Sequence, residues 1–271
     1  MDASYLTGKE SESCCAYNTE KLLAYLVSWG MEQSALDHLE GLKYNALLNS
    51  ASAATGLSQY EQPMGRNKKK RFSSPYGDFW CCTGSGIETM AALQGNLWFR
   101  DGDAVFPNLF VSSDLDLDLG EKRARLSLRT DYPKNCVAEI TITCEEDVPL
   151  TLKLKKHRVK NVRCSSGSCE TDEQKGDGFV RVRGVFRDGD RIGFDVVSPV
   201  VREPLSPAAP EVRCTKFGPI LLASVRRDEW KHPDGFLPVP PSTEDGKGFV
   251  PLYEVEDETY SVYEGPEVPA E

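Results

Sequence analysis

Hydrophobic residues recur every three or four positions through the first hundred residues of the chain, which is the spacing of amphipathic helices. Residues 15–29 follow this pattern, and Gly30 then favours a helix end. Residues 34–50 repeat it, with Ser34 available as an N-cap. A third helix is expected after a sharp TGSG turn at residues 83–86. The first part of the chain is therefore predicted to be helical.

After residue 100 the period of the hydrophobic pattern changes to two. Apolar and polar residues alternate in the stretches KRARLSLRT, AEITITC, PLTLKLKK, GFVRVRGV and RIGFDVV. One more buried strand is expected in TKFGPILLASV, at residues 215–225. Short strands that each have one apolar face, separated by turn signals such as RDGD, favour an antiparallel β-sandwich.

The change of period divides the chain into predicted domains. Residues 1–99 form a partial helical domain, residues 100–226 form the β-sandwich, and residues 227–271 form a proline-rich and acidic segment that is partly irregular. The fold class predicted from the pattern is therefore multi-domain α + β.

Composition and charge narrow the function classes. The chain has 271 residues, of which 39% are hydrophobic and 27% charged, as expected for a folded globular protein. A net charge of -10 argues against a nucleic-acid or membrane-surface partner, because phosphate binding needs a basic face. The basic run RNKKKR at residues 66–71 is expected to be a solvated loop, with a nuclear-import signal or an anion-binding patch as alternatives. No stretch approaches the roughly 20 apolar residues that cross a bilayer.

The chain has nine cysteines, an odd number that excludes a fully paired disulfide framework. Cys136 and Cys144 lie in strand-like stretches and are expected to pack as small hydrophobic residues. Cys164 and Cys169, in CSSGSC, could close a hairpin loop by a disulfide in an oxidising compartment.

Two adjacent cysteine pairs in the helical part need another explanation, because neighbouring thiols cannot easily pair with each other. A thiolate is both a zinc ligand and a nucleophile. Glu12 and Cys14 could supply two ligands of a tetrahedral zinc site, and Cys81 and Cys82 could supply the other two. The spacing lacks a C-x2-C pattern, so buried free cysteine is the alternative that spacing alone favours.

Several short motifs occur in a recognisable order, namely ESCCAYNTEKLLAYLVSW, LEGLKYNALLNS, YEQPMG and SSPYGDFWCCTGSGIE. Over residues 8–99 they resemble glycoside hydrolase family 127, the β-L-arabinofuranosidase family, and especially its plant-like branch. The resemblance implies a helical toroid of (α/α)6 type followed by β-sandwich domains. A dozen helices need more than about 100 residues, so the C-terminal part of such a toroid is expected here.

The resemblance also implies roles for individual residues. Glu12, Cys14, Cys81 and Cys82 match the zinc ligands, and Cys81 matches the nucleophile. Its thiolate would attack the anomeric carbon and form a thioglycosyl intermediate, which water then hydrolyses with overall retention. Most retaining glycosidases use a carboxylate as the nucleophile. Cys15 falls where the family varies and is expected to serve in packing.

Two further positions are expected to face the sugar or to support the cysteine. Glu40 and Tyr60 match family positions of this kind, although LEGLKYN lacks the usual tyrosine and arginine around Glu40. The alternatives are a solvated helix charge for Glu40 and an ordinary core aromatic for Tyr60. Trp80 is expected to pack below the thiolates, while Gly84 and Gly86 permit the predicted turn.

The resemblance places a general acid/base glutamate about sixteen residues before Glu12, a position that would precede Met1. The expected function is a zinc-dependent β-L-arabinofuranosidase-like hydrolase of arabinofuranoside-containing glycans, incomplete in this respect. The alternatives are a non-catalytic module, stapled by zinc, that binds carbohydrate or protein, and a redox-active dithiol protein. Helices that lack most of their toroid partners would expose apolar faces, so another chain is expected to cover them.

Overall fold

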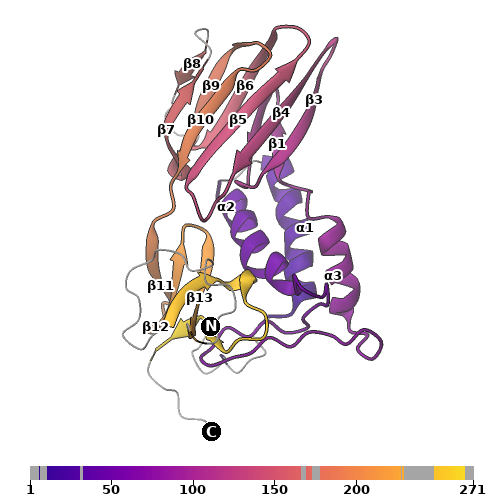
Figure 1. Cartoon of the computed structure of the whole chain (residues 1–271), viewed down its shortest axis with the longest axis vertical. Helices are drawn as coiled ribbons and strands as arrows, with labels where there is room; N and C mark the ends of the chain where they lie inside the picture. Colours follow the sequence, from indigo (N-terminus) through magenta and orange to yellow (C-terminus); the bar gives the residue numbers. More distant parts are fainter. Residues whose placement is uncertain are drawn as a thin grey trace. The chain divides into compact units, whose positions relative to one another are not determined.

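The computed structural model describes residue 6 and residues 11–30, 33–165, 169–172, 178–226, 228 and 247–265. It shows a mixed α+β protein whose strands pair mostly in antiparallel fashion (Figure 1). The chain divides into two compact units, one made of Met1–Leu93 with Pro199–Glu271 and the other of Gln94–Ser198. Within the described ranges, no helix is both long and apolar enough to cross a membrane.

The first unit contains the helices that the apolar spacing predicts. Helix α1 spans Ser13–Gly30 and helix α2 spans Gln33–Leu42. The chain continues from α2 through a π-helical turn, η2 (Lys43–Leu47), and a 3-10 turn, η3 (Leu48–Ser50). The predicted helix over residues 34–50 is therefore confirmed as one helical run whose winding changes after Leu42.

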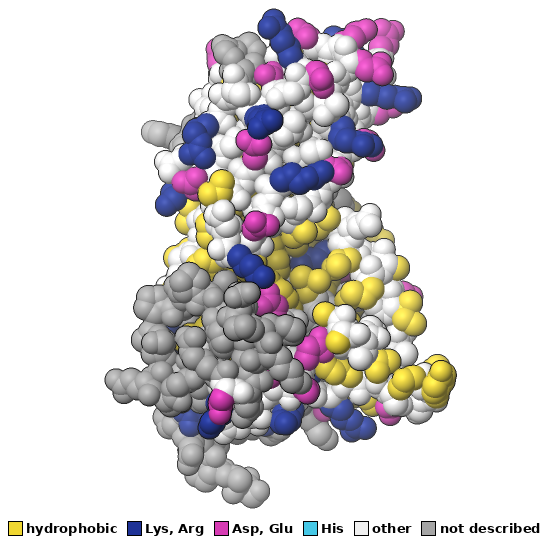
Figure 2. All heavy atoms as spheres, viewed as in Figure 1, with side chains coloured by type: hydrophobic (Ala, Val, Ile, Leu, Met, Phe, Trp, Pro, Cys, Tyr) yellow, Lys and Arg dark blue, Asp and Glu magenta, His cyan; other side chains and the backbone are white. Residues whose placement is uncertain are grey.

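Helix α1 has apolar residues on two sides. Tyr17, Leu23 and Val27 are buried in the unit. Leu22 and Trp29 are 56% and 77% exposed. Hydrophobic side chains gather on the surface where the helices lie (Figure 2). The helix therefore buries only part of the apolar surface that its sequence offers.

Helix α3 (Cys81–Ala91) begins before the position that the sequence favours. The predicted turn at residues 83–86 is wrong, because these residues form its first turns and Trp80 is the extended N-cap. Gly86 packs against Ser58, where a β-carbon would lie 2.8 Å from the Ser58 Cβ atom. Gly86 therefore permits close approach of a loop to a helix instead of a bend in the chain.

A sheet completes the first unit. Its strands run in the order β11 (Val200–Ser206), β12 (Ala209–Phe217), β13 (Ile220–Arg226) and β14 (Lys247–Pro251), with β15 (Tyr260–Ser261) beside β13 and β16 (Tyr263–Glu264) beside β12. The single strand expected at residues 215–225 is wrong, because the chain reverses between β12 and β13 at Gly218, whose φ is +58°. These strands group with the helices, whereas the sequence pattern had assigned residues 200–226 to the sandwich.

The second unit contains two five-stranded sheets in its described part (Figure 1). One has the order β1 (Trp98–Asp101), β2 (Ala104–Pro107), β6 (Val148–Lys155), β9 (Phe179–Phe186) and β8 (Glu170–Asp172). The other has the order β3 (Ser113–Leu119), β4 (Lys122–Thr130), β5 (Val137–Cys144), β10 (Arg191–Val196) and β7 (Val159–Cys164). Alternate residues of both sheets, such as Leu126 and Leu152, enter one buried cluster. The β2–β6 pair is parallel, so the unit is not purely antiparallel.

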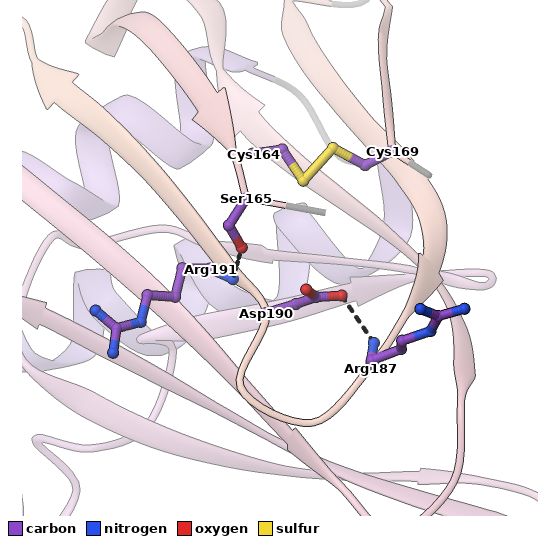
Figure 3. The surroundings of a disulfide bond; sticks show 6 residues. All are labelled: Cys164, Ser165, Cys169, Arg187, Asp190 and Arg191. Atoms are coloured by element: carbon purple, nitrogen blue, oxygen red, sulfur yellow. Dashed lines mark hydrogen bonds between the residues drawn. A yellow bond between two sulfur atoms is a disulfide. The ribbon is translucent and has the colours of Figure 1, made fainter. Parts of the chain in front are cut away.

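The second unit also holds a disulfide. Cys164, the last residue of β7, is bonded to Cys169, just before β8 (Figure 3). The adjacent Ser165 hydroxyl accepts a hydrogen bond of 2.7 Å from the Arg191 backbone amide, which ties this corner to β10. The disulfide suggested by CSSGSC is thus present. The expectation that it closes a hairpin is wrong, because β7 and β8 are edge strands of different sheets.

The basic run at residues 66–71 is held in place in the first unit. The backbones of Lys68 and Tyr260 exchange hydrogen bonds of 2.8 and 2.9 Å. The Lys70 side chain is buried, with 8% exposure. The expectation of a solvated loop is therefore wrong for Lys70, whereas Arg66, Asn67, Lys69 and Arg71 are exposed as expected.

Candidate metal and catalytic site

Three thiols from distant parts of the sequence meet where α1 packs against α3. Cys14 lies at the start of α1, and Cys81 and Cys82 are the first two residues of α3. The Cys14 and Cys81 Sγ atoms are 3.4 Å apart, and the Cys81 and Cys82 Sγ atoms are 3.8 Å apart. The Cys14 backbone amide donates to Cys82 Sγ at 3.4 Å. All three sulfur atoms lie within 4.8 Å of one another, which makes them a possible metal-binding group.

Glu12 and Tyr60 extend this cluster. The Cys14 thiol donates to Glu12 Oε2 at 3.6 Å, and the Tyr60 hydroxyl donates to Glu12 Oε1 at 3.0 Å. The Tyr60 carbonyl accepts hydrogen bonds from the Ser13 amide at 3.0 Å and from the Cys82 thiol at 3.7 Å. The hydrogen bond to Glu12 raises the pKa of Tyr60 to about 12. Tyr60 therefore contacts both segments that carry the thiols.

Gln62 is a supporting residue that the sequence analysis did not single out. Its side chain is fully buried. The amide donates to Ser13 Oγ and to the Ala46 carbonyl, both at 2.9 Å, and accepts from Asn49 at 3.0 Å. Gln62 thus ties the start of α1 to the end of the second helical run. The sequence signal that could have identified Gln62 is its place as an uncharged polar residue inside the YEQPMG motif.

Trp80 packs beside the cluster. Its ring centroid is 5.7 Å from that of Tyr60, and the Arg71 guanidinium lies 5.5 Å from the Trp80 ring. The Arg71 cation over the indole face is a cation–π arrangement. Trp80 therefore orders Tyr60 from one side while its own backbone leads directly into Cys81.

The three thiols differ in their access to solvent. Cys82 is fully buried, Cys14 is half-buried and Cys81 is exposed. Burial raises the pKa of Cys14, and its hydrogen bonds with Cys81 and Cys82 raise it further. Burial also raises the pKa of Cys82. These two thiols therefore hold their protons at neutral pH unless a cation binds beside them.

The spacing of the cluster suits a tetrahedral zinc ion. Zinc–sulfur bonds of about 2.3 Å at tetrahedral angles place two sulfur ligands about 3.8 Å apart, and a sulfur and an oxygen ligand about 3.6 Å apart. The observed contacts of 3.4 and 3.8 Å between sulfurs and of 3.6 Å between Cys14 Sγ and Glu12 Oε2 are close to these values. The donor set therefore fits zinc with small movements of the side chains.

Cys15 offers a second grouping. Its Sγ atom is 3.8 Å from Glu12 Oε2, and Glu12, Cys14 and Cys15 also lie close enough to hold a metal. The expectation that Cys15 serves in packing is wrong, because its side chain is exposed. Either Cys15 or the pair on α3 could complete a site with Glu12 and Cys14.

The contacts described above bring together all of the predicted site residues except Glu40. Glu40 lies on α2 and is only 1% exposed. A solvated helix charge is therefore excluded for Glu40. Its predicted place beside a sugar stays a prediction.

Comparison with known protein families matches two stretches of the chain. Residues 2–95 match the model described as Beta-L-arabinofuranosidase, GH127 catalytic domain, and residues 104–197 match the GH127 middle domain. The chain therefore belongs to glycoside hydrolase family 127.

Solved structures share the fold. A GH127 β-L-arabinofuranosidase from Geobacillus stearothermophilus T6 superposes with a TM-score of 0.69 at 16% identity, covering 94% of this chain and 49% of its own. Another GH127 β-arabinofuranosidase gives a TM-score of 0.71 at 18% identity, with coverages of 94% and 49%. A third structure, described as a glycoside hydrolase, superposes with a TM-score of 0.70 at 14% sequence identity, covering 94% of this chain and 52% of its own. The chain thus spans about half the length of these proteins. No curated protein sequence matches it.

Proposed function

We propose that the thiol cluster is a zinc-thiolate glycosidase site that acts on β-L-arabinofuranosides, with Glu12, Cys14, Cys81 and Cys82 as zinc ligands. The observation that carries this proposal is the convergence of three sulfur atoms and one carboxylate from segments 67 residues apart, at spacings close to those of tetrahedral zinc. Membership of a β-L-arabinofuranosidase family supports the sugar class.

Exposure favours Cys81 as the nucleophile. Zinc bound in the cluster would hold the thiols as thiolates. The Cys81 side chain is exposed and can reach a sugar, whereas Cys82 is fully buried and is left with a ligand's role. Cys81 Sγ would form a bond to the anomeric carbon as the bond to the leaving oxygen breaks. Water would then cleave the carbon–sulfur bond, and two displacements give overall retention.

Other residues support this arrangement. Tyr60 would act through Glu12, because its hydroxyl donates to one carboxylate oxygen and leaves the other facing Cys14. Glu40 is proposed to hold sugar hydroxyls. We assign no described residue to the general acid that protonates the leaving oxygen.

The family also suggests an architecture. We propose that α1, α2 and α3 belong to an (α/α)6-type toroid and that the strands of residues 104–197 form the β-sandwich that follows it in the sequence. Support comes from the matches to a catalytic and a middle domain and from the buried cluster shared by two sheets.

The metal is tested by elemental analysis of the purified full chain. We expect one zinc per chain, lost in Cys82→Ser and in Cys14→Ser. Cys136→Ser, in the other unit, is the matched control and should keep the metal. Loss in Cys15→Ser with retention in Cys82→Ser would replace the proposed ligand set by the Glu12, Cys14 and Cys15 grouping.

Turnover is tested with an aryl β-L-arabinofuranoside. Release of L-arabinose by the wild-type chain, abolished in Cys81→Ser while Cys136→Ser stays active, would support the glycosidase. A zinc-loaded wild-type chain without turnover would instead favour the non-catalytic module, in which zinc only joins α1 to α3.

A further inference from the structure

Two thiols that lie close together in the site come from different helices. Cys14 Sγ on α1 lies 3.4 Å from Cys81 Sγ on α3, compared with 3.8 Å between the sequence neighbours Cys81 and Cys82. A disulfide bond is about 2.05 Å long, so the two sulfurs need to approach by about 1.4 Å. Cross-linking two separate segments also avoids the small strained ring that a vicinal pair would form.

Exposure sets the order in which oxidation would proceed. Cys81 is exposed and Cys14 is half-buried beside it, whereas Cys82 is fully buried. A peroxide therefore reaches Cys81 first and converts its thiol to a sulfenic acid, releasing water. The Cys14 thiol then displaces hydroxide from that sulfur, and a second water forms with the disulfide. The two thiols supply two electrons and two protons to the peroxide.

The same chain already contains one oxidised pair. All nine cysteines lie in the described residues, and only Cys164 and Cys169 are bonded (Figure 3). Disulfides of this kind form in oxidising surroundings. Conditions that form the Cys164–Cys169 bond would therefore also expose the Cys14 and Cys81 thiols to oxidation.

We propose that Cys14 and Cys81 are a modification site, which forms a reversible disulfide when the cluster holds no metal. The effect of this disulfide on zinc binding rests on the proposed function. A disulfide removes two thiolates from the proposed zinc ligands, so oxidation and zinc binding exclude each other. Zinc would then protect the nucleophile, and its loss would expose the site to reversible inactivation.

The test uses the reduced, metal-stripped full chain treated with hydrogen peroxide. Free thiols are then alkylated, and the peptides are mapped without reduction. The expected product is a monomer in which the Cys14 peptide is linked to the Cys81 peptide, reversed by dithiothreitol. Cys14→Ser and Cys81→Ser should each abolish the link. Cys136→Ser is the matched control and should keep it. Circular dichroism confirms that each variant is folded.

A second arm repeats the oxidation after one equivalent of zinc is added, and we expect at least a tenfold slower cross-link. If the metal-free chain forms no such link, or Cys81 pairs with Cys15 or Cys82 instead, the inference is wrong even if zinc binds. If the chain binds no zinc but still links Cys14 to Cys81, the proposed metal site fails and the disulfide stands.

Discussion

Tyr60 is the residue that joins the carboxylate to the thiols. Its hydroxyl holds Glu12, its carbonyl meets the Cys82 thiol, and its ring lies against Trp80. A residue that hydrogen-bonds a metal ligand fixes the orientation of that ligand, and its loss lowers metal affinity. The motif YEQPMG indicated that Tyr60 belongs to the site, but only the fold shows that it acts on Glu12.

Tyr60→Phe removes this hydrogen bond while keeping the ring. We expect zinc affinity to fall about 10–100-fold, because Glu12 loses the group that orients its second oxygen. Competition with a chromophoric chelator measures the change. Tyr25→Phe, an exposed tyrosine on α1, is the matched control and should bind zinc as the wild type does. Equal affinities for all three proteins would show that Tyr60 does not orient the ligand.

Lys70 is buried in the first unit, and its Nζ atom has no hydrogen-bond partner among the described residues. Burial lowers the pKa of Lys70 from 10.5 to about 7, although Glu256 and Glu258 oppose the shift. Between these two values the unfolded chain holds a proton that the folded chain has released. Unfolding then takes up a proton, so this lysine makes stability rise with pH across that window.

Lys70→Met removes this titration. We expect the variant to gain most stability over the wild type at pH 7 and below, where the wild-type lysine is charged and buried. The gain should shrink towards pH 10, by at most about 1.4 kcal/mol per pH unit. Urea unfolding of both proteins from pH 6 to pH 10 measures it. A difference that stays constant with pH would contradict the assigned pKa.

At the scale of elements, the start of α3 decides the geometry of the thiol pair. Cys81 and Cys82 lie in its first turn, so their side chains point in different directions, one exposed and one buried. The glycines that follow were expected to make a turn. They lie within the helix, and only Gly86 contacts a neighbouring loop, at Ser58.

Gly84 and Gly86 therefore give a matched pair of substitutions in one helix. Gly84→Ala meets no atom within 4 Å and should stabilise α3 by up to about 1 kcal/mol, the helix preference of alanine over glycine. Gly86→Ala places its β-carbon 2.8 Å from Ser58 Cβ and should destabilise the protein by about 1–3 kcal/mol. Thermal unfolding compares them. Similar shifts in both variants would show that the loop moves away without cost.

At the scale of the whole molecule, an apolar stripe remains uncovered on the helices. We define it by the exposed residues Leu22, Tyr25, Leu26 and Trp29 on α1 and Ile87 and Met90 on α3. Figure 2 shows hydrophobic side chains gathered on this part of the surface. Contiguous exposed apolar surface promotes association. That another chain covers the helical face stays a prediction.

We expect the purified chain to self-associate through the apolar stripe. Replacing Leu22 and Trp29 together by glutamine should lower the apparent mass in sedimentation and reduce binding of an apolar dye. Val185→Gln, which replaces an exposed valine on β9, is the control and should change neither. A wild-type chain that stays monomeric at high concentration and binds no dye would contradict this role for the stripe.

The sequence predicted the elements whose hydrophobic pattern has a strong period, and its motifs indicated the family. The alternation of KRARLSLRT marked β4 from Lys122 to Thr130, and the helical spacing marked α1, because burying one face imposes a repeat on local sequence. Motifs around the cysteines indicated the family, because a reactive side chain needs particular residue types next to it in the sequence.

Tertiary structure decided what depends on contacts between distant residues. The sequence could not show that Gly218 reverses the chain, that β11 to β14 join the helical unit, or that Lys70 is buried. The separation of Cys14 from Cys81 and the exposure of Cys81 are likewise set by how α1 packs on α3. These properties depend on packing between segments that are far apart in the sequence. Packing of that kind leaves no local repeat from which it could be predicted.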